Sequence, residues 1–226
     1  MHVARIILVV LALGLAGCGG GDDDEQDAAD ETAVTTTSAA ADDGACRTVD
    51  APELKPDGGQ QSPVGTLDAT KAYSLLVETS CGAFTIELDQ KLAPKTSASL
   101  VSLAENGFFD NTIFHRVVPG FVIQGGDPTG SGTGGPGYKT VDVPPPGAAY
   151  TEGVVAMAKA GFEPPGTAGS QFFVVTGPDV GLPAEYAIVG KVTDGLEAVK
   201  AIDALGAGDG PPSMPVVIER VTVSEP

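Results

Sequence analysis

Short segments that alternate apolar and polar residues run through the chain from about residue 68 to its end. Phe84, Ile86 and Leu88 alternate with polar neighbours, and the valines of residues 217–223 fall on one parity. A period of two residues is typical of a half-buried strand. Further apolar runs, separated by Gly and Pro turn signals, cover residues 112–117, 121–124, 154–157, 172–175 and 187–192. So many short strands predict a β-sandwich or a β-barrel.

Two segments repeat apolar residues at helical spacing instead. The first begins at Pro94, which suits a first helical turn, and continues to the stop signal at residues 106–107. The second follows Thr193-Asp194 and ends before Gly206. Two helices and about eight strands predict a closed sheet whose ends are capped, in a domain that covers residues 68–226.

Residues 1–17 have the pattern of a signal peptide. Arg5 supplies a short positive region, and residues 6–15 form an apolar stretch that is too short to anchor in a bilayer. Residues 15–18, Leu-Ala-Gly-Cys, resemble a bacterial lipobox, in which the Cys is acylated and the peptide is cut just before it. The resemblance implies a lipid on Cys18 that anchors the chain to the extracytoplasmic face of the cell membrane. The alternative is an ordinary secreted protein, cleaved nearby, with Cys18 left as a thiol.

The next segment, residues 18–45, is strongly acidic. From residue 19 to 44 there are nine carboxylates and no Lys, Arg or aromatic residue. Such a sequence cannot bury enough apolar area to offset the entropy of ordering it, so we expect a solvated, disordered tether. Acidic side chains can also bind calcium, but nothing here resembles the spacing of a calcium-binding loop.

The charge of the whole chain excludes some classes of partner. The 226 residues include 30 acidic and 12 basic side chains, which give a net charge of −18. Nonspecific binding of nucleic acid depends on Lys and Arg contacts with phosphates, so we do not expect a nucleic-acid partner. Of the two histidines, His2 lies in the predicted signal peptide, and the three cysteines are far apart. No metal site is therefore expected.

If Cys18 carries lipid, Cys46 and Cys81 remain as a pair. In an extracytoplasmic, oxidising compartment, a disulfide between them is the simplest prediction. It would hold residues 46–67, a weakly patterned extension rich in Pro and Gly, against the domain near Cys81. Two unpaired buried thiols are the alternative.

Residues 114–127 carry the most informative side chains, in the order Phe-His-Arg-Val-Val-Pro-Gly-Phe-Val-Ile-Gln-Gly-Gly-Asp. Strand parity places Arg116 among aromatic and branched neighbours, and a cation in such a place needs a partner or a task. Farther along, Gln171 and Phe173 share one face of a strand. These groups could line a pocket with an apolar floor and one fixed cation. On these residues alone, Arg116 could also belong to a structural ion pair.

The block at 114–127, together with Gly-Ser-Gln-Phe-Phe at 169–173, resembles the cyclophilin-type peptidyl-prolyl cis/trans isomerases. The resemblance covers about residues 73–223. It implies an eight-stranded antiparallel closed barrel capped by two α-helices, with the active site on its outer surface. It also implies isomerisation of the bonds that precede proline in polypeptides, without a cofactor.

The same resemblance assigns the site residues. Arg116 matches the catalytic arginine, Phe121 matches a wall of the proline pocket, and Gln124 matches its polar support. The residues that it implies for substrate binding are His115, Val122, Met157, Ala158, Lys159, Gln171, Phe173, Leu182 and Tyr186. We expect His115 to be a structural or groove-edge residue rather than an acid–base group, because rotation about an amide requires no proton transfer.

Several departures from the family pattern bear on this pocket. Val122 stands where the family usually has Met, which leaves the pocket slightly shallower but still apolar. Gly181 falls where a Trp is familiar, and Tyr186 replaces a frequent His, so we expect weak affinity for cyclosporin. Two extra residues within 161–167 lengthen the loop before Gln171 and are expected to reshape the rim.

Together with the lipobox-like residues, the resemblance leads to our main hypothesis, a lipid-anchored extracytoplasmic isomerase that accelerates the proline-limited folding of exported proteins, and we expect it to be a monomer. One rival hypothesis is a noncatalytic holdase that grips proline-containing segments in the same pocket, and another is a purely structural lipoprotein. An Arg116 side chain that is turned inward and locked to an acidic neighbour, with no adjoining apolar hollow able to admit a five-membered ring, would exclude the enzyme.

Overall fold

The structure is a computed structural model that describes residues 46–225, so the predicted signal peptide and acidic tether lie outside the described residues. The helices are α1 (Pro94–Glu105) and α2 (Leu196–Asp203). The strands are β1 (Ser74–Thr79), β2 (Gly82–Leu88), β3 (Thr112–Ile113), β4 (Arg116–Val118), β5 (Val122–Gly125), β6 (Thr140–Val141), β7 (Val154–Met157), β8 (Thr167–Ala168), β9 (Phe172–Val175), β10 (Ile188–Asp194) and β11 (Val217–Ser224).

Both predicted helices and each predicted strand segment are confirmed, although one predicted strand is divided into two. The run 112–117 is two strands, because residues 114–115 separate β3 from β4. β1 has no counterpart among the predicted strands. Leu75, Leu76 and Val77 form a continuous apolar triplet, which hides the alternation in which Leu75 and Val77 are buried and Leu76 is exposed.

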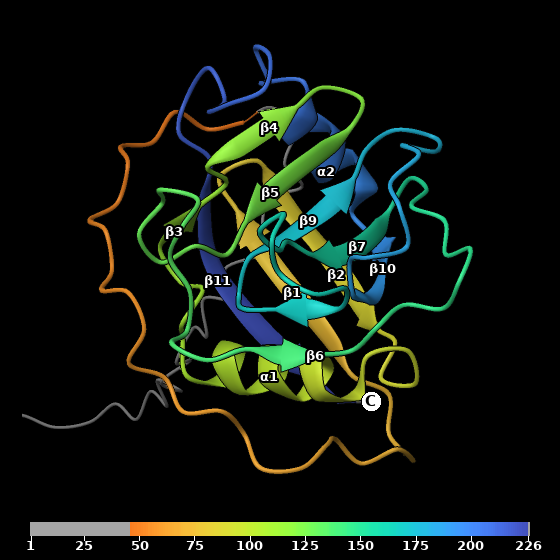
Figure 1. Ribbon diagram of the computed structural model, residues 1–226. Helices are drawn as coiled ribbons and strands as arrows, with labels where there is room; N and C mark the ends of the chain where they lie inside the picture. The colour runs from red at the N-terminus through yellow and green to blue at the C-terminus, as the bar shows by residue number, and fades with distance from the viewer. Residues whose placement is uncertain (1–45, 226) are drawn as a thin grey trace, which may run out of the picture. The chain divides into compact units, whose positions relative to one another are not determined.

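Nine strands form one curled antiparallel sheet in the order β3-β11-β1-β2-β10-β7-β9-β5-β4, and β6 pairs with β8 in a separate sheet (Figure 1). The predicted closed eight-stranded barrel is therefore wrong. The sheet ends at β3 and β4, which follow each other along the chain with two residues between them. In the described residues no ladder joins β3 to β4, and an isolated bridge between Ile113 and Asp127 connects β3 to the segment that follows β5, so the nine strands form an open, curled sheet.

Irregular pairing in the long strands contributes to the curl. The register shifts between Glu78 and Thr79 in β1 and twice in β10. Such bulges bend a strand and increase its twist. Gly190 in β10 lies so close to β2 that a Cβ there would be 2.0 Å from the carbonyl oxygen of Glu87, and only glycine fits this position.

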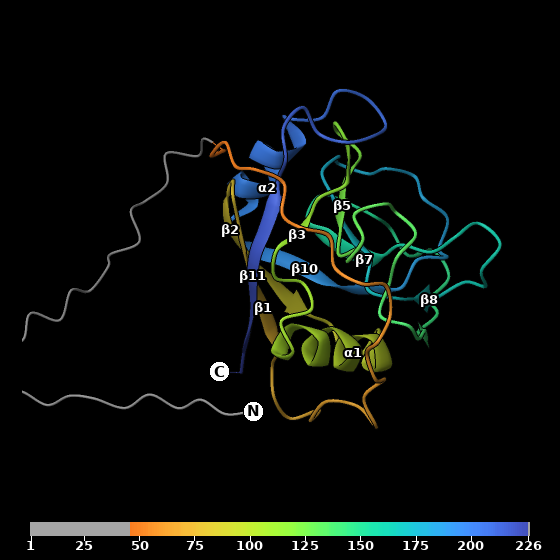
Figure 2. The same ribbon diagram turned by 90° about the vertical axis from the view of Figure 1, so that its left-hand side faces the viewer.

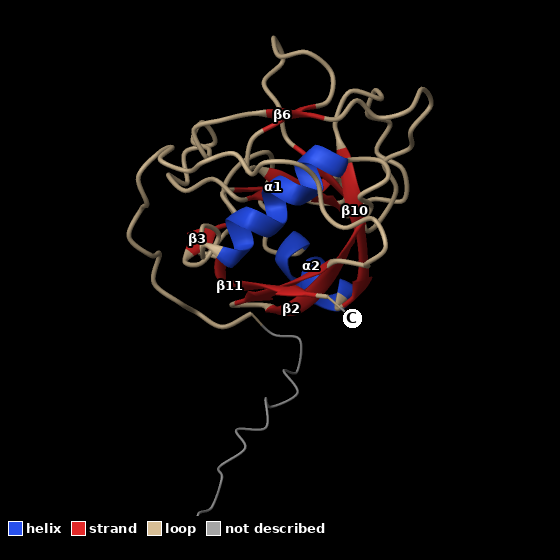
Figure 3. Ribbon diagram, turned by 90° about the horizontal axis from the view of Figure 1, so that it is seen from below, coloured by secondary structure: helices blue, strands red, loops and turns tan. Residues whose placement is uncertain are grey.

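The two helices lie at opposite ends of the curled sheet (Figures 1 and 3). α1 packs against β11 and β6, whereas α2 packs against β2, β4 and β5. The first turn of α1 is capped by Asp142, whose Oδ2 accepts hydrogen bonds from the amide and the hydroxyl of Thr96, both at 2.7 Å. Neither helix in residues 46–225 is long and apolar enough to cross a membrane.

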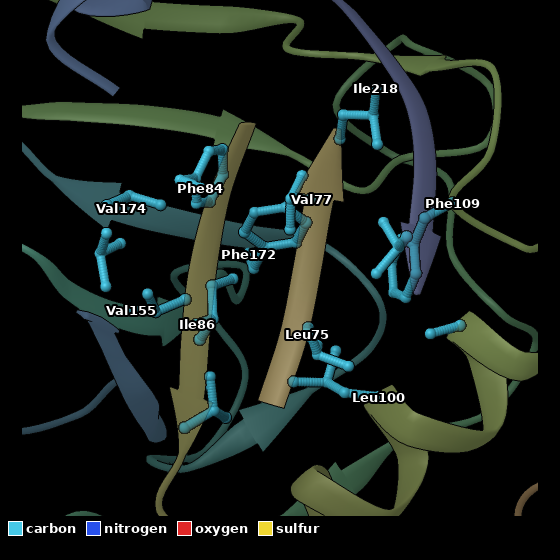
Figure 4. Close-up of a cluster of buried hydrophobic side chains, with 14 of the residues drawn as sticks. Leu75, Val77, Phe84, Ile86, Leu100, Phe109, Val155, Phe172, Val174 and Ile218 are labelled. Carbon is cyan, nitrogen blue, oxygen red and sulfur yellow. The ribbon is translucent and has the colours of Figure 1, made fainter. Parts of the chain in front are cut away.

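The main core lies inside the curl (Figure 4). Leu75 and Val77 of β1 meet Phe84 and Ile86 of β2, because alternate side chains of each strand point inward. Phe172 of β9 is 5% exposed, and the centroid of its ring lies 6.1 Å from those of Phe109 and Phe114. Both contacts are edge-to-face, which is a favourable geometry for aromatic rings.

The predicted disulfide between Cys46 and Cys81 is present. The amide of Arg47 donates to the carbonyl of Ser80 at 2.8 Å, so residues 46–67 begin beside the turn between β1 and β2. From there the extension follows the outside of the domain without helix or strand (Figure 2, orange).

Candidate active site

Three neighbouring strands bring predicted site residues into one row. Arg116 of β4 lies opposite Gln124 of β5, and Gln124 lies opposite Phe173 of β9. Residues directly opposite each other in antiparallel strands project to one face, with Cβ atoms about 4.5–5.5 Å apart. The sheet therefore places a cation, an amide and an aromatic ring side by side.

Phe121 joins this row from the turn between β4 and β5. Gly120 precedes it with a φ of 68°, and its amide donates to both carboxylate oxygens of Asp203, at 3.2 and 3.1 Å. The hydroxyl of Thr176 donates to the same carboxylate at 2.7 Å. Because Asp203 is the last residue of α2, the end of this helix fixes the turn that carries Phe121.

The row borders a hollow of about 270 Å³, which we call the Arg116 hollow. Its lining is Arg116, Phe121, Val122, Gln124, Ala158, Lys159, Phe173, Leu182 and Tyr186. Val122 and Phe173 are buried and pack with Tyr150 in a small apolar cluster, separate from the main core. The hollow thus combines an apolar base with one guanidinium and one amide.

The guanidinium of Arg116 is held on two sides. Its Nε and Nη2 donate to the carboxylate of Asp209 at 2.5 and 3.1 Å, and its Nη1 donates to Gln124 Oε1 at 3.2 Å. The hydrogen bond from Arg116 holds the pKa of Asp209 below its usual 3.8, so this carboxylate is charged near neutral pH. Three of the five guanidinium N–H donors are engaged by these bonds, which leaves two for a ligand.

Arg116 therefore has an acidic neighbour. The arrangement that would exclude catalysis, an Arg116 locked to an acidic group with no apolar hollow beside it, is nevertheless not the one observed. The side chains of Arg116 and Asp209 are 30% and 67% exposed, so the ion pair lies at the surface. The Arg116 hollow lies beside the same guanidinium.

Gln124 is held in turn by Gln171. Gln124 Nε2 donates to Gln171 Oε1 at 3.0 Å, and Gln171 Nε2 donates to the carbonyl of Gly134 at 2.9 Å. Gln171 lines an adjoining hollow of about 340 Å³, which also includes Lys139 and Phe162. Phe162, in the loop of residues 161–167, is 91% exposed and contributes to the lining of this hollow.

Lys159 and Tyr186 form another part of the wall of the Arg116 hollow. The side chain of Lys159 is 3% exposed, and its Nζ lies 3.1 Å from Glu185 and 5.5 Å from the centroid of the Tyr186 ring. The hydroxyl of Tyr150 donates to the carbonyl of Tyr186 at 2.8 Å and accepts from its amide at 3.0 Å. These bonds fix the backbone at Tyr186 and with it the wall.

Two predicted substrate-binding residues line neither hollow. Met157 is fully buried and belongs to the main core, whereas its β7 neighbour Ala156 belongs to the small apolar cluster with Phe173. His115 lies against the loop after β5, where its Nε2 is 3.7 Å from the position that a Cβ on Gly132 would take. Both ring nitrogens of His115 are buried and have no hydrogen-bond partner in the described part of the chain.

Acidification below pH 6.5 is expected to destabilise the fold through His115. Burial, with a smaller effect of Arg116, lowers the pKa of His115 below 6.5 against the opposing effect of Asp127. The unfolded chain then binds a proton more readily, so the stabilising effect of the neutral ring is complete above pH 6.5 and is lost as the pH falls through the lowered pKa.

Urea unfolding at about pH 7.5 and about pH 5.5 checks this expectation, with a lower free energy of unfolding expected at the acidic pH. His115→Gln should narrow the difference, because His115 is the one histidine within residues 46–225. If His115→Gln shows the same difference in free energy of unfolding between the two pH values as the wild type, other groups cause the pH dependence.

Asp209 is the contact of Arg116 that sequence reasoning missed. It lies in the loop after α2, 93 residues from Arg116, where the carbonyl of Gly210 accepts a hydrogen bond from the amide of Val117 at 2.8 Å. Its neighbours are both glycines, which signal a turn but not its place in the fold. The sequence did indicate that Arg116 needs an anionic partner. With 30 acidic residues in the chain, however, this need alone does not identify Asp209.

Comparisons with known proteins agree on one family. The model described as "Cyclophilin type peptidyl-prolyl cis-trans isomerase/CLD" matches residues 74–223. The chain is 39% identical to peptidyl-prolyl cis-trans isomerase A of Mycobacterium tuberculosis over 188 residues, which cover 74% of this chain and 98% of that protein. It is also 39% identical to peptidyl-prolyl cis-trans isomerase-like 1 of Gibberella zeae over 158 residues, covering 67% and 96% of the two chains.

Solved structures give the same result. The crystal structure of a cyclophilin type peptidyl-prolyl cis-trans isomerase from Cryptosporidium parvum matches with a TM-score of 0.62 and 32% identity, over 68% of this chain and 98% of that one. A second crystal structure of that protein, obtained in the presence of the dipeptide Ala-Pro, matches with a TM-score of 0.61 and 32% identity, over 67% and 98%.

Proposed function

The chain belongs to the cyclophilin-type peptidyl-prolyl cis-trans isomerases, and from this premise we propose that Arg116 is the group by which it accelerates rotation about Xaa-Pro bonds. The observation that carries the proposal is the guanidinium beside the Arg116 hollow, with two N–H donors left by its partners. The substrate is a proline-containing polypeptide, as the use of Ala-Pro with the Cryptosporidium parvum relative supports.

The reaction requires stabilisation of one twisted state. Rotation about a peptide bond has a barrier of about 18–20 kcal/mol, because the amide must lose its conjugation. At that moment the prolyl nitrogen regains a lone pair, so a donor aimed at it binds the transition state better than either planar isomer. No nucleophile and no proton transfer are needed.

Arg116 has the properties that this step demands. A guanidinium is always charged and presents a planar fork, so it can grip the prolyl carbonyl and donate to the nitrogen together. Acceleration of an uncatalysed rate of ~0.01 per second by about five decades requires about 7 kcal/mol of transition-state stabilisation. Charge-assisted hydrogen bonds and positioning together supply energies of this size.

The other residues of the hollow have supporting roles in this proposal. Phe121 and Phe173 hold the pyrrolidine ring still over the apolar base. Gln124 binds the carbonyl that turns, and Gln171 orients Gln124 through the hydrogen bond between their side chains. Ala158 and the backbone of Lys159 receive the residues that precede proline.

The test is cis–trans exchange of an Xaa-Pro peptide, measured by NMR with the purified chain. Faster exchange that saturates with peptide is the expected result. Peptide binding without faster exchange would instead favour the holdase. If the chain neither binds the peptide nor accelerates its exchange, the structural lipoprotein is the remaining hypothesis.

Replacing Asp209 with Asn is expected to lower kcat/KM by about threefold, because an exposed ion pair contributes modestly to the orientation of Arg116. The pKa of Asp209 lies below 3.8, so the pair persists above that pH and is lost only as the pH falls through the lowered pKa. The wild-type rate should therefore not vary with this group between about pH 5 and 8. Asp194→Asn, at an exposed aspartate, is the control, and a faster Asp209→Asn enzyme would contradict the expectation.

We also propose that the enzyme acts on exported proteins at the extracytoplasmic face of the membrane. The lipobox-like residues 15–18 and the Cys46–Cys81 disulfide, of a kind that persists in oxidising compartments, support this location. Labelled palmitate should enter the full chain but not a Cys18→Ser variant. Equal labelling of the two would exclude Cys18 as the site.

A further inference from the structure

A segment at the start of the described chain, residues 46–60, is fastened to the domain at several points, and we call it the strap (Figure 2, orange). Its first residue forms the disulfide with Cys81. Midway, Lys55 Nζ donates to the carbonyls of Gly107 and Phe108, just beyond the end of α1, at 2.9 and 3.0 Å. The amide of the same residue donates to the carbonyl of Pro128 at 2.9 Å, so Lys55 also joins the strap to the loop after β5.

The strap then binds the loop of residues 127–137. Asp57 Oδ1 accepts a hydrogen bond from the amide of Gly135 at 2.8 Å, and the amide of Gly58 donates to the carbonyl of Gly135 at 2.9 Å. Both backbone groups of Gly135 are thus bound by two consecutive residues of the strap.

The backbones of strap and loop touch without intervening side chains. Gly58 and Gly137 have φ values of +73° and +93°, which favour glycine. A Cβ on Gly137 would lie 3.1 Å from the Cα of Gly58. A side chain on Gly137 would therefore push the strap away, and the sequence provides glycine on both sides of the contact.

The peptide group between Gly134 and Gly135 connects this contact to the active site. Its N–H donates to Asp57, and its carbonyl accepts the hydrogen bond from Gln171 Nε2 at 2.9 Å. Because a peptide group is planar, a partner that fixes the direction of the N–H also fixes the direction of the carbonyl. Asp57 therefore helps to fix where the acceptor of Gln171 lies, together with Asp127, whose Oδ2 accepts a hydrogen bond from the amide of Gly134 at 3.3 Å.

From Gln171 the hydrogen bonds run in one direction. Arg116 donates to Gln124, Gln124 donates to Gln171, and Gln171 donates to the carbonyl of Gly134. The N–H of the same peptide group donates to Asp57, so the series runs from the guanidinium of Arg116, which can only donate, to the carboxylate of Asp57, which can only accept. These two ends determine the orientation of the side-chain amides of Gln124 and Gln171. Hydrogen bonds in such a series polarise one another.

We propose that Asp57 is a positioning residue of the isomerase, which orients Arg116 through the Gly134–Gly135 peptide and the side-chain amides of Gln171 and Gln124. The inference rests on the proposed role of Arg116. It gives the strap, which precedes the matched residues 74–223, a part in catalysis.

The experiment compares Asp57→Ala with Asp57→Asn in the complete chain. Ala removes the acceptor, and kcat for an Xaa-Pro peptide should fall about three- to fivefold while KM changes little. Asn retains an acceptor oxygen and should restore most of the rate. The matched control is Asp50→Ala, at an exposed aspartate of the same strap for which no side-chain hydrogen bond occurs in residues 46–225.

The same change in an Arg116→Ala background separates positioning from a general structural effect. If Asp57 acts through Arg116, Asp57→Ala should have no further effect on kcat there, because residues of one network are not additive. The NMR signals of the Gln171 and Gln124 side-chain amides should also move in Asp57→Ala and not in Asp50→Ala.

An unchanged kcat in Asp57→Ala, or an equal loss with and without Arg116, would overturn this inference and leave the proposed function standing. Wild-type activity in Arg116→Ala alone would overturn both.

Discussion

Replacing Arg116 with Ala is expected to reduce kcat/KM for an Xaa-Pro peptide by about 10²- to 10³-fold, the effect of removing one preorganised donor to a developing charge. The hydrogen bond to Gln124 holds the guanidinium of Arg116 beside the hollow. Replacing Arg116 with Ala removes both the positive charge and the N–H donors from this place. Arg116→Lys should recover only part of the loss, because an ammonium lacks the planar fork. Exchange between cis and trans peptide signals, measured well below the melting temperature, gives the rates.

Arg47 offers a matched control for this change. It is also an arginine on the surface paired with a carboxylate, that of Glu219 at 2.5 Å, but it does not line the Arg116 hollow. Arg47→Ala should keep the wild-type kcat/KM. Undiminished activity in Arg116→Ala would remove Arg116 from the mechanism.

Replacing Phe172 with Ala is expected to lower the free energy of unfolding by about 3–5 kcal/mol, the usual cost of truncating a buried Phe. Phe172 is 5% exposed and meets Phe109 and Phe114 edge-to-face inside the curl, so its loss leaves a cavity at the junction of three rings. Because the chain has no Trp, urea unfolding is best followed by circular dichroism.

Phe162→Ala removes the same side chain from an exposed loop and serves as the control. Phe162 is 91% exposed, so its truncation should change the free energy of unfolding by less than about 0.5 kcal/mol. Equal stabilities of the two variants would contradict the placement of Phe172 in the core.

The secondary structure was largely predictable because its signals are local. Pro94 and residues 106–107 bound α1 as expected, and alternation identified β2 and β11. The closure of the sheet was not predictable, since it depends on pairing between its two ends, at β3 and β4, rather than on the residues of either strand. β6 and β8, of two residues each, are too short to show a period.

The site divides in the same way. Strand parity placed Gln171 and Phe173 on one face, and the family resemblance supplied Arg116 and Gln124; the row of Arg116, Gln124 and Phe173 follows from the register of β4, β5 and β9, which the structure gives. Asp209 and Asp57 come from irregular segments far along the chain, and no periodicity locates such residues. The fit of Met157 in the core likewise follows from packing that a motif does not describe.

The two ends of the curled sheet have a consequence for the release of product. β3 and β4 have two and three residues, and the amide of Val117 in β4 is already bonded to the carbonyl of Gly210. Short, occupied edges are poor templates for strand addition, so an extended client chain cannot join the sheet by a ladder of backbone bonds. Contact then depends on the lining of the Arg116 hollow rather than on a ladder of backbone bonds, which favours dissociation of the client after its prolyl bond has turned.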